Sequence, residues 1–264
     1  MKNVLITGGA GGLGLAAAKY LAERGCRVFS CDIVKYREAH ANITQYIMDV
    51  RDTAAIQAVF DEVEKVAPEL DAVIHLSGLF AMDSFIEIDE KELANFIDVN
   101  IMGVYRVNKV FLPLLRKHGR IVITTSEVAG LNPFPFAAIY SLVKTALEHY
   151  ARALRLELCL LGVSVVELKP GAFTTAMTGS TGPALDRMIA KTQLYKMNTL
   201  SFKKVMEGEI GKGRHPDVLA KVVGKIVEAK DPKPVYKVRN SLFLKLFSIL
   251  PLRMQVRVIR KILK

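Results

Sequence analysis

The sequence predicts a single α/β domain of 264 residues, in which helices cover both faces of a doubly wound parallel sheet. Short apolar runs alternate with longer segments of helical periodicity through the first 170 residues, as in successive βαβ units. The short runs are continuously apolar, which is typical of strands buried on both faces. Composition agrees, because 51% hydrophobic and 24% charged residues are ordinary for a globular protein.

Taken in order, the expected strands occupy residues 4–7, 27–32, 72–77, 120–126 and 163–169, and the expected helices occupy 13–24, 53–66, 89–117 and 138–160. Residues 172–215 carry Thr, Gly and Ser clusters around a short expected helix at 183–196. The strand at 163–169 is the sixth once a further strand before Asp49 is counted. We expect the segment after it to be a substrate flap within one catalytic domain spanning residues 1–264.

The net charge of +11 is confined to the last quarter of the chain. Residues 1–200 contain 21 basic and 21 acidic residues, whereas residues 201–264 contain 16 basic and 5 acidic ones. The basic segment lacks interleaved aromatic residues and any known nucleic-acid motif, so no nucleic-acid partner is expected.

Cysteine usage and the N-terminus bear on location. Cys26, Cys31 and Cys159 have no metal-ligand spacing, which predicts no metal site and a reducing compartment. The N-terminus reaches its glycines before any signal-type apolar run, and no run approaches the roughly 18 residues that a membrane span requires. We therefore expect a cytoplasmic protein.

A glycine-rich loop joins the first expected strand to the first expected helix, and Gly8, Gly12, Leu13 and Gly14 belong to it. Glycines permit a tight turn and a close approach to a pyrophosphate, and the helix N-terminus supplies free N–H groups. The alternative is a flexible turn without a ligand. In this strand–loop–helix context, the loop predicts dinucleotide binding.

Asp32 ends the second expected strand, 18 residues after the last loop glycine. A carboxylate there can accept hydrogen bonds from the adenosine ribose hydroxyls, and it would repel a 2′-phosphate. The nearest basic residues are Lys35 and Arg37, outside the loop. Asp32 therefore predicts NAD rather than NADP, unless it is merely a solvated residue at a strand end.

Tyr140 and Lys144 lie four residues apart in the expected helix 138–160, so their side chains share one face. Such a pair is common in helices by chance. A nearby ammonium and the positive charge of an oxidised nicotinamide would both lower the pKa of a tyrosine. If the helix faces the carboxyl ends of the strands, Tyr140 can act as a general acid/base.

These motifs, in this order, resemble the short-chain dehydrogenase/reductase family, which has a Rossmann-like fold. The resemblance covers residues 3 to about 180. It implies a catalytic tetrad in which Asn100 anchors a water relay, Ser126 binds the reacting oxygen, Tyr140 transfers the proton and Lys144 also binds the nicotinamide ribose. The residues implied to bind the cofactor are Thr7, Gly8, Gly12, Leu13, Gly14, Asp32, Asp49, Val50, Ser77, Gly78, Asn100, Tyr140, Lys144, Pro170, Gly171 and Thr175.

Two departures from the family pattern stand out. His75-Leu76-Ser77-Gly78 occupies the place of the usual Asn-Asn-Ala-Gly, so the amides that brace the centre of the sheet are missing. We expect His75, on an apolar strand, to be a core histidine rather than a base. Ser126 lies 14 residues before Tyr140, one more than is common in the family, which indicates a one-residue insertion in the connecting loop.

Apolar residues flank these motifs, and about half are expected to line an apolar cleft: Leu79, Phe80, Ala81, Met82, Val128, Leu131, Phe134, Phe136, Phe173 and Met177. Such a cleft suits a bulky lipophilic secondary alcohol or ketone. The resemblance favours the hydroxysteroid and retinol dehydrogenase side of the family, with a hydroxysteroid, a bile acid or a similar lipid as substrate. A 3-oxoacyl-type reductase and a catalytically silent NAD-binding sensor or scaffold remain alternatives.

The tail, residues 241–264, contains six basic residues and no acidic one. Pro251 is expected to begin or kink a helix in which Arg253, Arg257, Arg260 and Lys264 share a face. The helix can lie on an anionic membrane surface, pack on its own domain or a dimer mate, or form a lid for an anionic lipid. The family resemblance also implies a homodimer or homotetramer, formed through the helices expected at 89–117 and 138–160.

Overall fold

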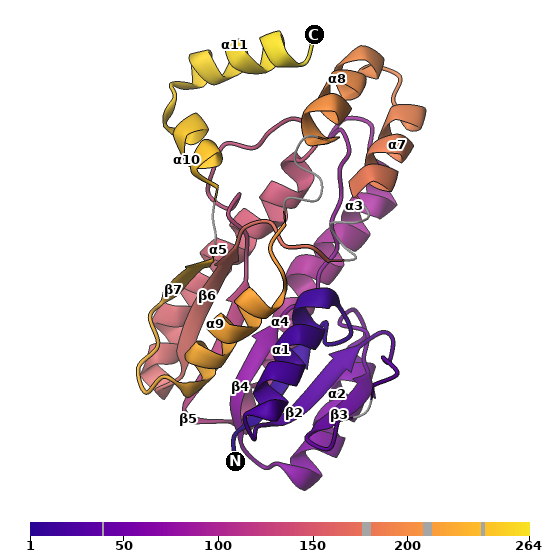
Figure 1. Cartoon of the computed structure of the whole chain (residues 1–264). Coiled ribbons are helices and arrows are strands. Elements are labelled where there is room, and N and C mark those ends of the chain that lie inside the picture. Colours follow the sequence, from indigo (N-terminus) through magenta and orange to yellow (C-terminus); the bar gives the residue numbers. More distant parts are fainter. Residues whose placement is uncertain (39, 176–180, 208–212, 239–240) are drawn as a thin grey trace.

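Seven parallel strands form one sheet in the computed structural model, which describes all residues except 39, 176–180, 208–212 and 239–240 (Figure 1). The strand order is β3-β2-β1-β4-β5-β6-β7, and it reverses between β1 and β4. At such a reversal, adjacent loops diverge and leave a crevice at the carboxyl ends of the strands. The strands are β1 Asn3–Thr7, β2 Arg27–Asp32, β3 Ile43–Ile47, β4 Leu70–His75, β5 Leu115–Thr124, β6 Ser164–Pro170 and β7 Val235–Val238.

Helices cover both faces of the sheet (Figure 1). One face packs against α2 (Thr53–Val66), α4 (Gly103–Phe111) and α5 (Ala138–Leu158). The other packs against α1 (Gly12–Glu23) and α9 (Asp217–Glu228). The expected doubly wound domain is therefore confirmed.

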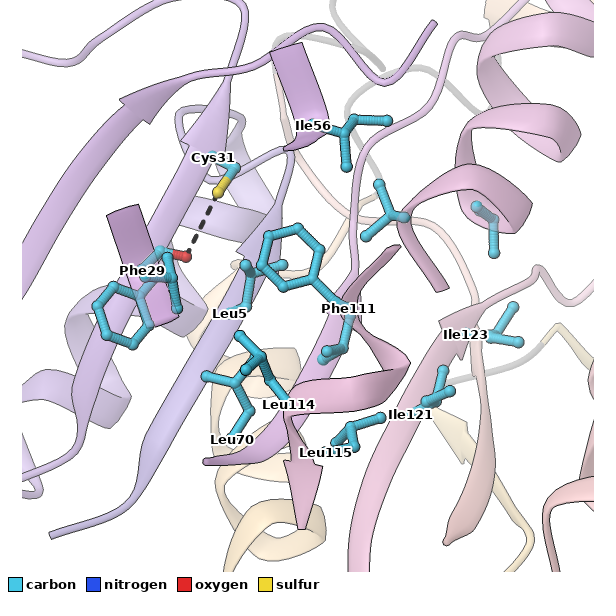
Figure 2. Packing of buried hydrophobic residues seen from close by; sticks show 14 of the residues in the cluster. Leu5, Phe29, Cys31, Ile56, Leu70, Phe111, Leu114, Leu115, Ile121 and Ile123 are labelled. Carbon is cyan, nitrogen blue, oxygen red and sulfur yellow. Dashed lines mark hydrogen bonds between the residues drawn. The ribbon is translucent and has the colours of Figure 1, made fainter. Parts of the chain in front are cut away.

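The core on the α2, α4 and α5 side shows why the strands read as continuous apolar runs. Leu5, Phe29 and Ile121 point into this layer beside Phe111 of α4 (Figure 2). The alternate residues of the same strands, such as Ile6, are equally buried in the opposite layer. Both side-chain directions of a strand are thus apolar because both faces of the sheet are covered.

The long helix expected at 89–117 is wrong at its C-terminal end. α3 (Glu90–Ile97) continues through a π-helical turn, Asp98–Met102, into α4, and a 3-10 turn, Leu112–Leu114, leads into β5. Pro113 cannot donate a backbone hydrogen bond, so the helix stops there and the chain enters the sheet five residues earlier than expected. The strands β3 and β7 were also absent from the predicted runs.

The expected flap is built from two helices in its described part, α7 (Thr181–Lys191) and α8 (Lys196–Glu207), rather than one at 183–196. Its base is closed by a bridge between Phe173 and Arg214, where Thr174 N donates to Arg214 O at 2.9 Å. The tail forms α10 (Leu242–Ile249) and α11 (Leu252–Ile262). No helix within the described residues is long and apolar enough to cross a bilayer.

Helices α7, α8, α10 and α11, here called the end cap, lie at the end of the molecule opposite the N-terminus (Figure 1). They enclose a small separate apolar cluster. Its buried members are Met82, Phe136, Leu185, Met188, Phe202 and Leu263. The end cap is therefore joined to the sheet domain partly through Phe136, in the loop that precedes α5.

Candidate active site

The glycine loop is so tight that side chains cannot be added. A Cβ on Gly14 would lie 1.9 Å from Gly8 O, and one on Gly8 would lie 2.4 Å from Ser77 N. Gly8 also has a positive φ of 72°, which favours glycine. The loop thus brings the N-terminus of α1 against the end of β4, with backbone N–H groups placed for an anion.

Asp32 lies at the end of β2 and secures this loop. Its carboxylate accepts hydrogen bonds from Ala10 N at 2.9 Å and Ile33 N at 2.7 Å. The same side chain lines the cavity beside the loop. Two backbone hydrogen bonds therefore hold the carboxylate at the carboxyl end of β2, beside the cavity.

The cavity at the carboxyl edge of β1, β2 and β4 has a volume of about 320 Å³. It is lined by ten of the residues expected to bind the cofactor: Gly8, Gly12, Leu13, Gly14, Asp32, Asp49, Val50, Ser77, Gly78 and Thr175. Its lining also includes residues that sequence reasoning missed, among them Gly11, Ile33, Met48, Arg51, Leu76, Asn95 and Val99.

The other six residues expected to bind the cofactor are not among the lining residues: Thr7, Asn100, Tyr140, Lys144, Pro170 and Gly171. Thr7 is fully buried, and its Oγ1 lies 2.9 Å from Ser77 Oγ. Gly171 N donates to Val238 O at 2.9 Å, which ties the end of β6 to β7. Thr7 thus lies behind the wall of the cavity and braces Ser77.

Arg51 is the most informative of the missed residues. It donates to Asp49 Oδ2 at 2.6 Å through Nη2 and to Asn95 Oδ1 at 2.8 Å through Nη1. The hydrogen bonds from Arg51 lower the pKa of the Asp49 carboxyl. The guanidinium at the cavity is therefore already occupied by two partners. Its position directly after Asp49-Val50 was the available sequence signal.

Tyr140 and Lys144 lie one turn apart near the start of α5. Tyr140 is hydrogen-bonded to Ser126, and Lys144 Nζ donates to Thr124 O at 3.0 Å. The ammonium lies 5.6 Å from the centre of the Tyr140 ring. The sheet end that carries Ser126 thus brings three of the four tetrad residues together.

Asn100 completes the group, and the π-helical turn positions it. Its Nδ2 donates to Phe96 O at 2.9 Å, and its Oδ1 accepts from Leu79 N at 3.3 Å. A Cβ on Gly78 would lie 2.8 Å from Asn100 Oδ1 and 3.9 Å from Lys144 Nζ. A side chain at residue 78 would therefore collide with the Asn100 amide and contact the Lys144 ammonium. π-Helical turns are frequent at functional sites.

Burial disfavours charge on both members of the proton-transfer pair. It raises the pKa of Tyr140 to about 12, although the hydrogen bond with Ser126 opposes this shift. It lowers the pKa of Lys144 to about 8. Desolvation therefore sets the direction of the Tyr140 pKa shift in the protein alone. The expected lowering by the ammonium together with an oxidised nicotinamide stays a prediction.

The loop that carries Ser126 is held from behind by a buried ion pair. Lys169 Nζ lies 2.9 Å from Glu148 Oε2 and donates to Ala129 O at 3.3 Å. Ala129 N in turn donates to Ser126 O at 3.1 Å. The same loop contains Phe136 with a φ of 65°, a strained value for an aromatic residue. Packing of that ring in the end-cap cluster offsets the strain.

His75 belongs to the core, as expected. Its Nε2 lies 2.7 Å from Asn108 Oδ1, and burial lowers the pKa of the ring to about 4. Its Nδ1 has no partner among the described residues. The ring is therefore neutral at ordinary pH, and its hydrogen bond runs to α4, away from Tyr140.

The apolar residues expected around the substrate have different positions. Phe80 packs edge-on against Tyr140 with ring centres 5.1 Å apart, and Leu79 lines the cavity. Phe134 contacts Phe247 of α10, and Phe136 joins the end-cap cluster. Phe173 is a core residue between the sheet and α9, and so belongs to the half that does not line a cleft. Met177 lies outside the described residues.

Comparison with known proteins shows which proteins this chain resembles. The family model described as short chain dehydrogenase matches residues 2–186. A 3-ketodihydrosphingosine reductase of Bacteroides thetaiotaomicron is 28% identical over 230 residues, which cover 87% of this chain and 84% of the relative. Estradiol 17-beta-dehydrogenase 2 of Rattus norvegicus is 35% identical over 191 residues, which cover 68% of this chain and 50% of that protein.

Solved structures agree on the fold. A short chain dehydrogenase family protein of Francisella tularensis has a TM-score of 0.75 at 21% identity, covering 90% of this chain and 96% of that one. A 3-ketoacyl-(acyl-carrier-protein) reductase of Brucella melitensis complexed with NADH has a TM-score of 0.73 at 21% identity, covering 90% and 95%.

Proposed function

The chain belongs to the short-chain dehydrogenase family of oxidoreductases, and from this premise we propose that it transfers hydride between NAD(H) and a bulky lipophilic secondary alcohol or ketone. The observation that carries the proposal is the hydrogen-bonded pair of Tyr140 and Ser126 beside Lys144, at the same sheet edge as the cavity. A catalytically silent scaffold would not need this arrangement.

The cofactor would supply the acceptor or donor of hydride. Tyr140 Oη takes the alcohol proton during oxidation or returns it to the ketone oxygen during reduction. Ser126 Oγ hydrogen-bonds the reacting oxygen, and Lys144 binds the nicotinamide ribose. Asn100 anchors a water behind Lys144. The neutral phenol of the protein alone is the protonation state that reduction requires.

NAD rather than NADP is supported by two of the charged residues that line the cavity. Asp32 presents a carboxylate where a 2′-phosphate would be repelled. Arg51, the cation that lines the cavity, is engaged by Asp49 and Asn95. The test compares kcat/KM with NAD and NADP for the wild type and Asp32→Ala. We expect NAD to be preferred and the preference to narrow in the variant. Equal use of both cofactors by the wild type would contradict the proposal.

A lipophilic substrate is supported by Phe80, whose ring packs edge-on against Tyr140. Two relatives are also named for lipids, 3-ketodihydrosphingosine and estradiol. NADH absorbance should be followed with steroids, bile acids, long-chain ketones, a 3-oxoacyl thioester and a sugar. Turnover of a lipid alcohol or ketone is expected. Preference for the thioester would favour the 3-oxoacyl alternative, and no turnover at all would favour a silent scaffold.

We also propose a homodimer or homotetramer in a reducing, cytoplasmic setting. Met102, Tyr105 and Leu142 leave apolar surface exposed on the π-helical turn, α4 and α5. All three cysteines are free thiols. Light scattering should give at least twice the chain mass of 29.2 kDa, and Leu142→Glu should lower it. A monomer in the wild type would contradict the oligomer.

A further inference from the structure

The C-terminal helix α11 is docked on α8. Leu263 packs in the end-cap cluster with Phe202, and Ser201 Oγ donates to Lys264 O at 2.7 Å. Gln255, on the inner side of α11, is 2% exposed and donates to Leu250 O at 2.7 Å. The rotation of α11 about its axis is therefore set by these contacts, and so is the face that it presents outward.

That outward face is basic. Arg253, Arg257, Arg260 and Lys264 are exposed and recur at i, i+4, i+7 and i+11, opposite Gln255. None of these four forms an ion pair with a residue in the described part of the chain. By contrast, Lys203 of α8 is paired with Asp186 of α7 at 2.6 Å. The positive charge on α11 is thus left for an external partner.

Large aliphatic side chains are also exposed on the helices of the end cap. Leu246, Ile249 and Leu252 surround the corner between α10 and α11 and are 57%, 76% and 65% exposed. On α8, Met197 and Leu200 are 69% and 43% exposed. We call these five residues and the four basic residues the docking face. Several exposed aliphatic side chains at one end of a molecule are typical of an interaction site.

We propose that the docking face lies on an anionic lipid bilayer, with the basic residues against the phosphate and carboxylate headgroups and the aliphatic residues in the acyl boundary. The unpaired cations supply the attraction to an anionic surface, and aliphatic side chains suit a hydrocarbon layer without needing a shaped pocket. A second copy in a symmetric contact would bring the arginines of both chains together, which costs energy. The proposal does not rest on the proposed reaction.

The consequence is a defined orientation. α8 and α10 contact Phe136 and Phe134, in the loop between Ser126 and Tyr140. The docking face therefore places the carboxyl edge of the sheet toward the bilayer, and the N-terminus points away from it (Figure 1).

Vesicle co-sedimentation tests whether the basic residues of the docking face bind an anionic bilayer. The full chain is mixed with phosphatidylcholine vesicles with and without phosphatidylserine, at about 0.1 M and about 1 M salt, where the Debye length falls from about 10 to 3 Å. Binding is expected only to the anionic vesicles at low salt. Arg253→Gln/Arg257→Gln/Arg260→Gln should weaken it roughly a hundredfold, at about fivefold per charge.

The matched control removes the same charge from exposed residues of α9 and of the turn that follows it, as Lys221→Gln/Lys225→Gln/Lys230→Gln. It should bind nearly as the wild type does. Absence of binding to anionic vesicles overturns the proposal, and so does equal weakening by both triple variants. If the arginine variant still binds the vesicles but its assembly has a different mass by light scattering, the docking face would contact a second copy instead.

The chain contains no Trp, so single tryptophans report insertion directly. Leu252→Trp and Met197→Trp should show a blue-shifted emission on anionic vesicles. Leu160→Trp, at a position 84% exposed after α5, should show no shift. A shift in all three variants, or in none, overturns the assigned face. A shift for Leu252→Trp without Met197→Trp overturns the assignment of α8 to it.

Discussion

The glycine loop and the end cap are held in place by different kinds of contact. In the loop, backbone meets backbone, and a Cβ on Gly14 would lie 1.9 Å from Gly8 O. In the end cap, a few side chains such as Phe202 and Leu263 make the contacts, and large residues such as Met197 remain exposed. The difference teaches that the glycine loop has no room for added side chains, whereas exposed positions of the end cap can change without a steric clash.

The largest effect is expected in the sheet domain, at Tyr140, the residue proposed to transfer the proton. Tyr140→Phe keeps the ring against Phe80 and removes the acidic proton, so turnover should fall about 10²–10⁴-fold. NADH binding, measured by fluorescence titration, should persist. Tyr150→Phe, on the same helix but bonded to Asn108, is the control and should retain activity. Near-normal turnover in Tyr140→Phe would contradict the assigned role.

Large-to-small substitutions compare the cores of the two regions. Phe29 and Phe202 are both fully buried, and replacing a buried Phe by Ala typically costs about 3–5 kcal/mol. Phe29→Ala should lower the free energy of unfolding of the whole domain, measured in urea. Phe202→Ala should mainly open the end cap, so limited proteolysis at α8 and α11 should accelerate while the main transition moves less. Equal shifts of the main transition would show that the two regions unfold as one unit.

The pH dependence of stability probes the buried pair at the junction of the two regions. Lys144 has its pKa lowered from 10.5 to about 8, so between these values the unfolded chain binds more protons than the folded one. Stability of the cofactor-free protein should therefore rise over this window, by up to about 3 kcal/mol, relative to Lys144→Met.

Tyr140 acts in the opposite sense at higher pH. Its pKa is raised from 10.0 to about 12, so stability should fall above pH 10.0 as the unfolded chain loses its proton first. Urea denaturation at several pH values measures both effects: the rise in stability due to Lys144 and the fall due to Tyr140. A flat difference between wild type and Lys144→Met would indicate that water reaches the ammonium.

Glycine substitutions sharpen the contrast at smaller energies. Gly14→Ala should cost about 1–3 kcal/mol, as overpacking does, and should abolish nucleotide binding because the loop must move. Gly25→Ala is the control, since Gly25 has a φ of 80° but open space around it. It should cost about 1–2 kcal/mol and leave NADH binding intact. Loss of binding in both variants would remove the steric explanation.

The smallest effect is expected on the end cap. Met197→Ser and Leu200→Ser change exposed positions, so stability should stay within about 0.5 kcal/mol of the wild type. Activity on a water-soluble substrate should also be unchanged. A large loss of stability would mean that these side chains pack against something in the protein itself.

The sequence by itself determined the features that are local. The bounds of α2 agree with the expected helix at 53–66, because apolar periodicity and the Asp52 cap act within one turn. The glycine loop and the Tyr140–Lys144 pair could likewise be predicted, since tight turns and i, i+4 spacing depend on neighbouring residues alone.

Only the tertiary structure decided which side chains meet across the sheet. It placed Thr7 behind Ser77, moved Phe173 into the core, and engaged Arg51 with Asn95 from α3. It also buried Tyr140, and this burial raises the pKa of the phenol in the protein alone. Each outcome depends on burial and on contacts between segments far apart in the chain. Neither can be predicted from the spacing of residues within one segment.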